Sequence, residues 1–269
     1  MTYLVFNSKD SDYALEISKI QEIAPIRVLE PVQVKSPWVK GATKIRSKFF
    51  YIFDFRKILG LPTILEERQQ LVEILNQRER DHVEWLDALY KAITEKTEFT
   101  KAKDPTKCNF GKWYYSYKAP DATIRRLLDQ FEEPHNRIHS LAEKLLTLAE
   151  TDQQKAVEIL EDEKRFTLAK MIKLFAELRQ VLINNIRSLL IVLGPVFDSA
   201  VVIEVDAIDN LRNLDKENLE VRNIKTDNNL INKVWVNDKT TIYGIDYASL
   251  YGMLCDIQYP SNDLVRPQI

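Results

Sequence analysis

The chain has 269 residues, of which 45% are apolar and 29% are charged, and its formal net charge is −2. This composition is typical of a globular protein that forms one large domain or two ordinary ones. The near-neutral charge provides no basic field, so we expect neither nucleic acid binding nor membrane insertion. Two cysteines are too few for a disulfide framework, the first residues lack a signal-peptide pattern, and no apolar run approaches a membrane span. We therefore expect a cytoplasmic protein.

Residues 2–62 consist of short β-rich runs separated by polar turns. The runs include TYLVF, YALEI and KFFYIFDF, and the last of them leads into LGLP. Apolar and aromatic runs of this length, bounded by turn residues, predict short strands.

Strand signals disappear between residues 64 and 187, where Gly111 is the single glycine. Three long helical patterns cover residues 64–93, 122–150 and 151–190, and KCNFGKWYYSY is long enough for a short helix. Pro134 is expected to kink or restart the second helix, and Thr151 or Asp152 is a plausible N-cap for the third. Long amphipathic helices joined by short loops favour an antiparallel bundle.

Strand-like runs return after residue 188, as LLIVLG, SAVVIEVDAI, KVWVN and TTIYGIDY. The order is therefore β, helical and again β. We interpret this order as one β domain, residues 1–63 and 188–269, interrupted by a helical insertion at residues 64–187. An even number of helices would return the chain to the end where it entered, which leaves both β halves free to pair.

The three histidines of the protein, His82, His135 and His139, all lie in this helical segment together with Cys108. His135 and His139 are four residues apart, so on a helix they project from the same face. Three imidazoles and one thiolate can complete a tetrahedral zinc site. The same residues are also compatible with hydrogen-bonded histidines in a small aromatic core, so spacing alone leaves both interpretations open.

Three sequence blocks resemble the pattern of the chemoreceptor zinc-binding (CZB) domain. That pattern has a His near an aromatic residue, a Cys-x-apolar-Gly-x-apolar block and a closing His-x-x-x-His. Its counterparts here are HVEW at 82–85, CNFGKW at 108–113 and HNRIH at 135–139. The resemblance implies a four-helix bundle in which Zn²⁺ is bound by His82, Cys108, His135 and His139. It also implies a role similar to that of cytoplasmic sensors attached to signalling proteins, with zinc or hypochlorous acid as the input.

Cys108 is also the candidate redox-sensing residue, because a zinc-bound thiolate is the form that oxidants attack, giving a sulfenic acid first. Gly111 would allow close approach of neighbouring backbone, and Trp113 would help to exclude water. Four acidic residues are candidate acceptors for the outer imidazole N–H groups, namely Asp81, Glu84, Glu132 and Glu133.

The flanking β segments resemble the two halves of a CheW-like chemotaxis coupling domain. The matching features include LVF at 4–6, YAL at 13–15 leading into a short helix with Ile20 and Ile23, PWVKG at 37–41 and FDF at 53–55. The resemblance implies an α+β protein with two five-stranded β-barrels that share a core. Arg46 matches an exposed arginine that contacts partners in this family. Two departures weaken that correspondence, because Arg46-Ser47 replaces Arg-Gly and Asn237-Asp238-Lys239 replaces a typical Asp-Gly-Arg turn.

The combined resemblance implies a non-catalytic adaptor with no catalytic residues. Its β domain would couple a chemoreceptor signalling tip to a chemotaxis histidine kinase, and its bundle would add the zinc or oxidant input and a possible homodimer contact. Two alternatives remain. Three histidines with an open zinc position would make a metalloenzyme, although no His-Glu-x-x-His motif is present. A closed zinc site could also be purely structural.

Overall fold

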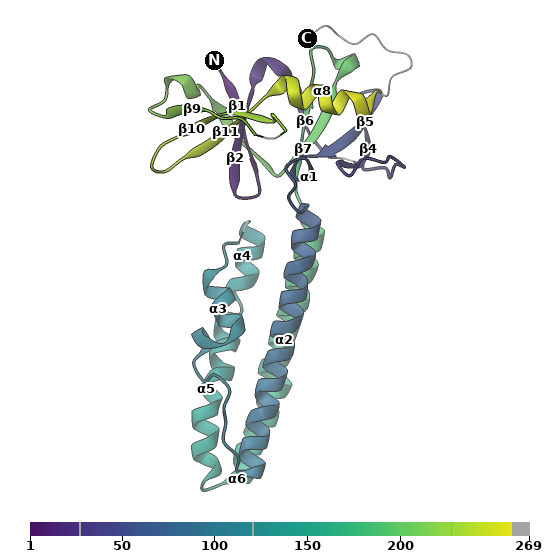
Figure 1. The fold of residues 1–269 in the computed structure, drawn as a ribbon. Helices are drawn as coiled ribbons and strands as arrows, with labels where there is room; N and C mark the ends of the chain where they lie inside the picture. The colour runs from purple at the N-terminus through teal and green to yellow at the C-terminus, as the bar shows by residue number, and fades with distance from the viewer. Residues whose placement is uncertain (27, 120, 227, 260–269) are drawn as a thin grey trace. The chain divides into compact units, whose positions relative to one another are not determined.

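The computed structural model describes residues 1–26, 28–119, 121–226 and 228–259. The chain packs as two units. The β unit combines Met1–Ile64 with the residues from Arg187 onward, and the helical unit comprises Leu65–Ile186. Figure 1 shows the sheets of the first unit and the helices of the second. Among the described helices, none combines the length and the hydropathy that a membrane-spanning helix requires.

The first sheet of the β unit has six strands in the order β8-β1-β2-β11-β10-β9. Neighbouring strands are antiparallel except for β2 and β11, which are parallel. Leu4 and Phe6 of β1 and Leu15 of β2 are buried in the main core of the unit. The strands are β1 (Tyr3–Ser8), β2 (Ser11–Glu16), β8 (Ala207–Arg212), β9 (Glu220–Asn223), β10 (Ile231–Val236) and β11 (Thr241–Ile245).

The second sheet has five strands in the order β3-β6-β7-β5-β4. They are β3 (Ile20–Pro25), β4 (Val39–Ile45), β5 (Lys48–Asp54), β6 (Leu189–Leu193) and β7 (Val201–Val205). Both sheets combine strands from before and after the helical segment, since β5 pairs with β7 and β2 with β11. All five residues of β7 are buried.

Near the C-terminal end of β7, two acidic residues accept hydrogen bonds from side chains of other segments of the β unit. The Glu204 carboxylate accepts from the Lys40 ammonium at 2.7 Å and from the Ser188 hydroxyl. Asp206 accepts two hydrogen bonds from the Arg56 guanidinium, whose side chain is 8% exposed. These contacts tie β4, Arg56 and the residue ahead of β6 to the end of β7.

In its described residues, the β unit also contains two α-helices and three 3₁₀ turns. The Asp54 carboxylate caps the first helix by accepting from the Lys57 N–H, and the Asp246 carboxylate caps the second by accepting from the Ser249 N–H. The elements are α1 (Phe55–Ile58), α8 (Tyr247–Gln258), and 3₁₀ turns at Ile17–Lys19, Phe197–Ser199 and Leu214–Lys216.

The helical unit is built around the 32-residue helix α2, which begins at Ile64, the last residue of the first segment of the β unit. Its core is one cluster that includes Leu86 and Leu89 of α2, Ile138 of α5, and Met171 and Phe175 of α7. The elements are α2 (Ile64–Glu95), a 3₁₀ turn at Pro105–Lys107, α3 (Asn109–Ser116), α4 (Ala122–Asp129), α5 (Glu132–Ala149), α6 (Gln153–Glu163), a π-helical segment at Lys164–Leu168, and α7 (Ala169–Asn184).

The predicted α+β class is confirmed, and four local predictions need correction. The first sheet has six strands rather than five. Ile20 and Ile23 lie on β3 and not on a helix, because pairing with β6 takes up the backbone hydrogen bonds of this segment. The third helical pattern ends at Asn184, and Leu189 and Leu190 belong to β6. The second pattern divides ahead of α5, and Pro134 falls in the first turn of that helix, where a missing N–H costs little.

Candidate metal centre

Helix α2 places His82 in the interior, where the residue is 3% exposed. Its Nδ1 lies 2.7 Å from the Arg78 carbonyl oxygen, one helical turn earlier. A carbonyl oxygen can only accept, so Nδ1 carries the proton and donates it. Nε2 is then the unprotonated nitrogen, and it is buried without a hydrogen-bond partner among the described residues. An orphaned lone pair of this kind fits a metal ligand.

Helix α5 places His135 and His139 one turn apart, and the two residues are 0% and 2% exposed. His139 Nδ1 lies 3.0 Å from the Ala102 carbonyl oxygen, so this imidazole has the same tautomer as His82 and also leaves a buried, unpartnered Nε2. His135 differs, because its Nε2 lies 3.2 Å from Cys108 Sγ while its Nδ1 is the buried nitrogen without a partner.

Cys108 occupies the N-cap of α3, and its Sγ accepts from the Gly111 N–H at 3.1 Å. The thiol also donates to the Pro105 carbonyl oxygen at 3.3 Å. A Cβ at position 111 would lie 1.9 Å from that same oxygen, so only glycine lets the turn at Pro105–Lys107 pack against α3. This close contact fixes the direction in which Sγ points.

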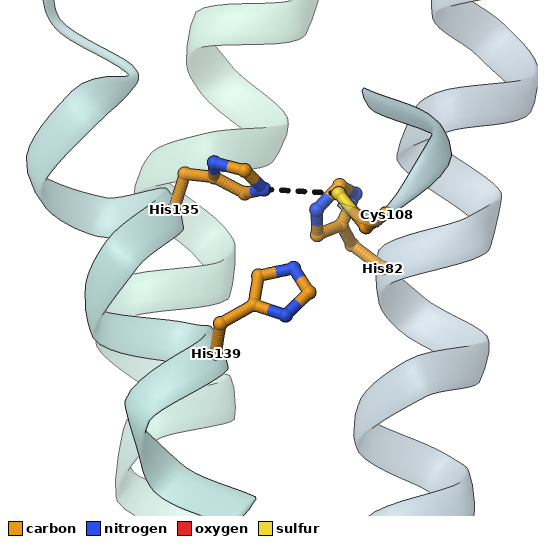
Figure 2. Close-up of side chains that lie close together, drawn as sticks. All are labelled: His82, Cys108, His135 and His139. Atoms are coloured by element: carbon orange, nitrogen blue, oxygen red, sulfur yellow. Dashed lines mark hydrogen bonds between the residues drawn. The ribbon is translucent and has the colours of Figure 1, made fainter. Parts of the chain in front are cut away.

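One ligand atom from each of His82, Cys108, His135 and His139 lies within 4.8 Å of all the others. Figure 2 shows the three imidazoles and the sulfur converging from α2, α5 and the start of α3. In a tetrahedral zinc site the ligand atoms are roughly 3.3–3.8 Å apart, given bonds of about 2.0–2.3 Å. The cluster therefore needs to contract by only about 1 Å to close around an ion.

The ionisation of these groups also suits metal binding. Burial, together with the neighbouring imidazoles, lowers the pKa of His135 to about 3 and that of His139 to about 4. Burial lowers the pKa of His82 as well. All three imidazoles are therefore neutral near pH 7, which is the form that binds metals. Burial raises the pKa of the Cys108 thiol, and a bound cation would act in the opposite direction.

The imidazole N–H groups that point away from the cluster donate to backbone carbonyl oxygens, and not to the four acidic residues that the sequence suggested as acceptors. Asp81 accepts from Gln77 and Arg78, Glu84 lies 3.9 Å from the Lys101 ammonium, Glu132 accepts from Tyr115 and Asn136, and Glu133 accepts from Lys170. The two imidazoles with an outer partner use the carbonyl oxygens of Arg78 and Ala102. A backbone carbonyl has no residue-type signal, so the sequence could not indicate these partners.

Aromatic rings contact the cluster. Phe110 makes edge contacts with His82 and His135 at centroid distances of 5.6 and 4.9 Å, and Trp85 lies 5.1 Å from His139. A cavity of about 150 Å³ adjoins the cluster, and its lining includes Trp85, Cys108 and Phe110. The cluster therefore lies at the wall of a cavity that is large enough for small solutes.

Arg46 lies in the β unit, in the two-residue turn between β4 and β5. Its backbone has φ of 54°, a left-handed conformation that costs a non-glycine residue about 1 kcal/mol or more. Its side chain is 64% exposed, pairs with Glu22 at 3.0 Å and lies over the Phe197 ring at 4.8 Å. The structure thus presents Arg46 at the surface.

In comparisons with known proteins, two segments of this chain match family models. Residues 82–146 match the chemoreceptor zinc-binding domain, and residues 2–89 match the CheW-like domain. Among solved structures, the chain is similar to the scaffolding protein TtCheW from Thermoanaerobacter tengcongensis. The two are 11% identical with a TM-score of 0.37, over 91% of this chain and 88% of the other. A search of curated proteins gave no match.

Proposed function

Because the chain carries a CheW-like domain and a chemoreceptor zinc-binding domain, we propose that it is a non-catalytic adaptor in chemotaxis signalling. Its β unit couples a chemoreceptor signalling tip to a histidine kinase in the cytoplasm, and its helical unit supplies a zinc-dependent or oxidant-dependent input. The observation that carries this proposal is the convergence of four ligand atoms within 4.8 Å of one another.

In this proposal, His82, Cys108, His135 and His139 are the zinc ligands. The buried, unpartnered Nε2 atoms of His82 and His139 and the lowered pKa values of the imidazoles support the assignment. A bound zinc ion would keep Cys108 as a thiolate and tie α2, α3 and α5 together.

Cys108 is also the proposed point of oxidant attack, with hypochlorous acid as one such oxidant. Cys108 lines the cavity of about 150 Å³ beside the cluster, which supports access by a small molecule. Oxidation of the thiolate to a sulfenic acid removes a good metal ligand and disturbs the N-cap of α3. Oxidation of Cys108 would thus change how the helices of the helical unit pack.

We assign the domain organisation on the same basis. Residues 64–187 are a four-helix bundle inserted between the β halves 1–63 and 188–269, with α2, α3, α4–α5 and α6–α7 as its four arms. Closure of the two sheets into barrels belongs to the same proposal. Arg46 is a contact for the receptor or the kinase, supported by its exposure at a turn. The helical unit also provides the contact of a homodimer.

The test combines metal analysis with a coupling assay. Wild-type protein is expected to contain about one zinc ion per chain, and Cys108→Ala much less. Kinase activity is then measured with receptor, with and without a chelator. If the chelator changes the coupling of receptor to kinase only for wild-type protein, the result supports a zinc-sensing role. Identical coupling in both conditions rules out zinc control, and a metal-free sample that fails to fold identifies the zinc as structural.

X-ray absorption separates the adaptor from a metalloenzyme. One sulfur and three nitrogen ligands are expected for the closed site, which leaves no position for a reacting water. A bound water oxygen in place of the sulfur would instead favour an open, hydrolytic zinc.

A further inference from the structure

One backbone carbonyl joins two of the aromatic side chains around the cluster. The Ala102 carbonyl oxygen accepts from the Trp85 indole N–H at 2.7 Å and from His139 Nδ1 at 3.0 Å. A carbonyl oxygen has two lone pairs, so both donors are satisfied at once. Trp85 belongs to α2 and His139 to α5. Ala102 therefore connects two helices that are distant in sequence.

The segment around Ala102 depends on these contacts for its position. Residues 96–104 contain no helix or strand, so they lack a regular hydrogen-bonding ladder. Phe99 packs edge-on against Trp85 at 5.0 Å, and Trp85 itself is 4% exposed. The segment leads directly to the turn at Pro105–Lys107, which bonds Cys108. Trp85 thus holds in place a segment that leads from the hydrogen-bond partner of His139 to that of Cys108.

We propose that Trp85 is a positioning residue of the metal cluster, which acts through the Ala102 carbonyl on His139. The indole N–H holds this carbonyl where it keeps the His139 proton on Nδ1 and leaves Nε2 facing the other ligand atoms. Without that hydrogen bond, the carbonyl loses one of its two anchors and His139 can change tautomer or rotate. The inference rests on the proposed zinc site. Loss of a direct outer partner of a ligand lowers metal affinity by about 10–100-fold, so an effect passed on through such a partner is expected at the lower end of this range.

The experiment compares Trp85→Phe with Trp235→Phe. The first variant keeps a ring against Phe99 and His139 but removes the indole donor. The control residue lies on β10 in the β unit, where it is 1% exposed and its indole N–H has no hydrogen-bond partner among the described residues. Zinc affinity, measured by chelator competition, is expected to fall about 10-fold in Trp85→Phe and to stay within about 2-fold in the control.

A second readout needs no metal. Nitrogen NMR of the metal-free protein is expected to show His139 as the Nδ1–H tautomer in wild type and a mixture of tautomers in Trp85→Phe. If that variant does not fold, a tryptophan analogue with sulfur in place of the indole N–H preserves the shape and removes only the donor.

The outcomes separate this inference from the proposed function. Unchanged zinc affinity and an unchanged His139 tautomer would overturn the positioning role, even if zinc binds. A wild-type protein that takes up no zinc, but whose His139 tautomer depends on the Trp85 donor, would refute the metal site and keep the role of Trp85.

Discussion

At the scale of single residues, Gly111 makes the sharpest stability prediction. Gly111→Ala would place a Cβ 1.9 Å from the Pro105 carbonyl oxygen, which forces the turn away from α3 and displaces Cys108. We expect a loss of about 1–3 kcal/mol in unfolding free energy and weaker zinc binding, measured by urea titration and chelator competition. Gly252→Ala on α8 is the control, because nothing lies within 4 Å of its added Cβ. Equal stability of the two variants would contradict the packing argument.

Substitution of Arg46 tests its backbone conformation through protein stability and its exposed side chain through partner binding. Arg46→Gly relieves the left-handed conformation at φ 54° but removes the exposed ion pair with Glu22. Because the two effects oppose each other, unfolding free energy is expected to change by less than about 1 kcal/mol. Binding to receptor or kinase is expected to weaken in a pull-down, while Arg222→Ala retains it. Full binding by Arg46→Gly would remove this residue from the proposed contact.

At the scale of elements, the π-helical segment Lys164–Leu168 follows directly after a buried acid. Glu163 accepts from Arg137 of α5 and from Thr167 of the segment itself. Burial alone would raise the pKa of Glu163, but the hydrogen bonds from Arg137 and Thr167 and the Arg137 charge lower it on balance. A depressed pKa stabilises the fold above the unfolded value of about 4.3, and the contribution disappears as pH falls through the folded value.

Glu163→Gln should therefore destabilise the protein by about 1.5–3 kcal/mol at pH 7. The difference from wild type should shrink as the pH falls below about 4.3. Thermal unfolding across this pH range measures it, with the exposed Glu161→Gln as control. A difference that stays constant down to the lowest pH would show that the carboxylate charge is not responsible.

Helix α3 should respond most strongly to metal removal. It has eight residues and buries only Phe110 and Gly111, so it is too short to persist without tertiary contacts. Chelation is expected to accelerate amide hydrogen exchange in residues 96–116 while α6 and α7 keep their protection. Uniform loss of protection across the helical unit would instead indicate that zinc stabilises the whole bundle.

At the scale of the whole molecule, the β unit should fold without residues 65–186. Asp54 of β5 and Leu190 of β6 both pair with Glu204 of β7, so the strands before and after the deleted segment lie about 10 Å apart. Residues 55–64 remain in the product, and a Gly/Ser linker of about six residues, which reaches about 20 Å when extended, joins residue 64 to residue 187. We expect a folded product with strand-type circular dichroism and cooperative unfolding. A product without cooperative unfolding would show that the β unit needs the helical unit.

The sequence was sufficient to predict the α+β class, because the pattern of apolar residues changes from strand-like to helical near residue 64 and back near residue 188. It was insufficient where the pairing of distant strands decides the structure. Ile20 and Ile23 were expected on a short helix, but the backbone hydrogen bonds of their segment to β6 make it a strand. The candidate ligands stood out because the chain has only three histidines. Their outer partners at Arg78 and Ala102 did not, because a carbonyl belongs to every residue and only the fold selects which one is used.

The contacts of Glu204 and Asp206 gather three separate stretches of the β unit at the end of β7. Glu204 accepts from Lys40 of β4 and from Ser188 ahead of β6. Asp206 accepts from Arg56 of α1, which also donates to the Pro62 carbonyl oxygen at 3.4 Å. Because two positions at one strand end carry all of these contacts, loss of either carboxylate would loosen stretches that lie far apart in the sequence.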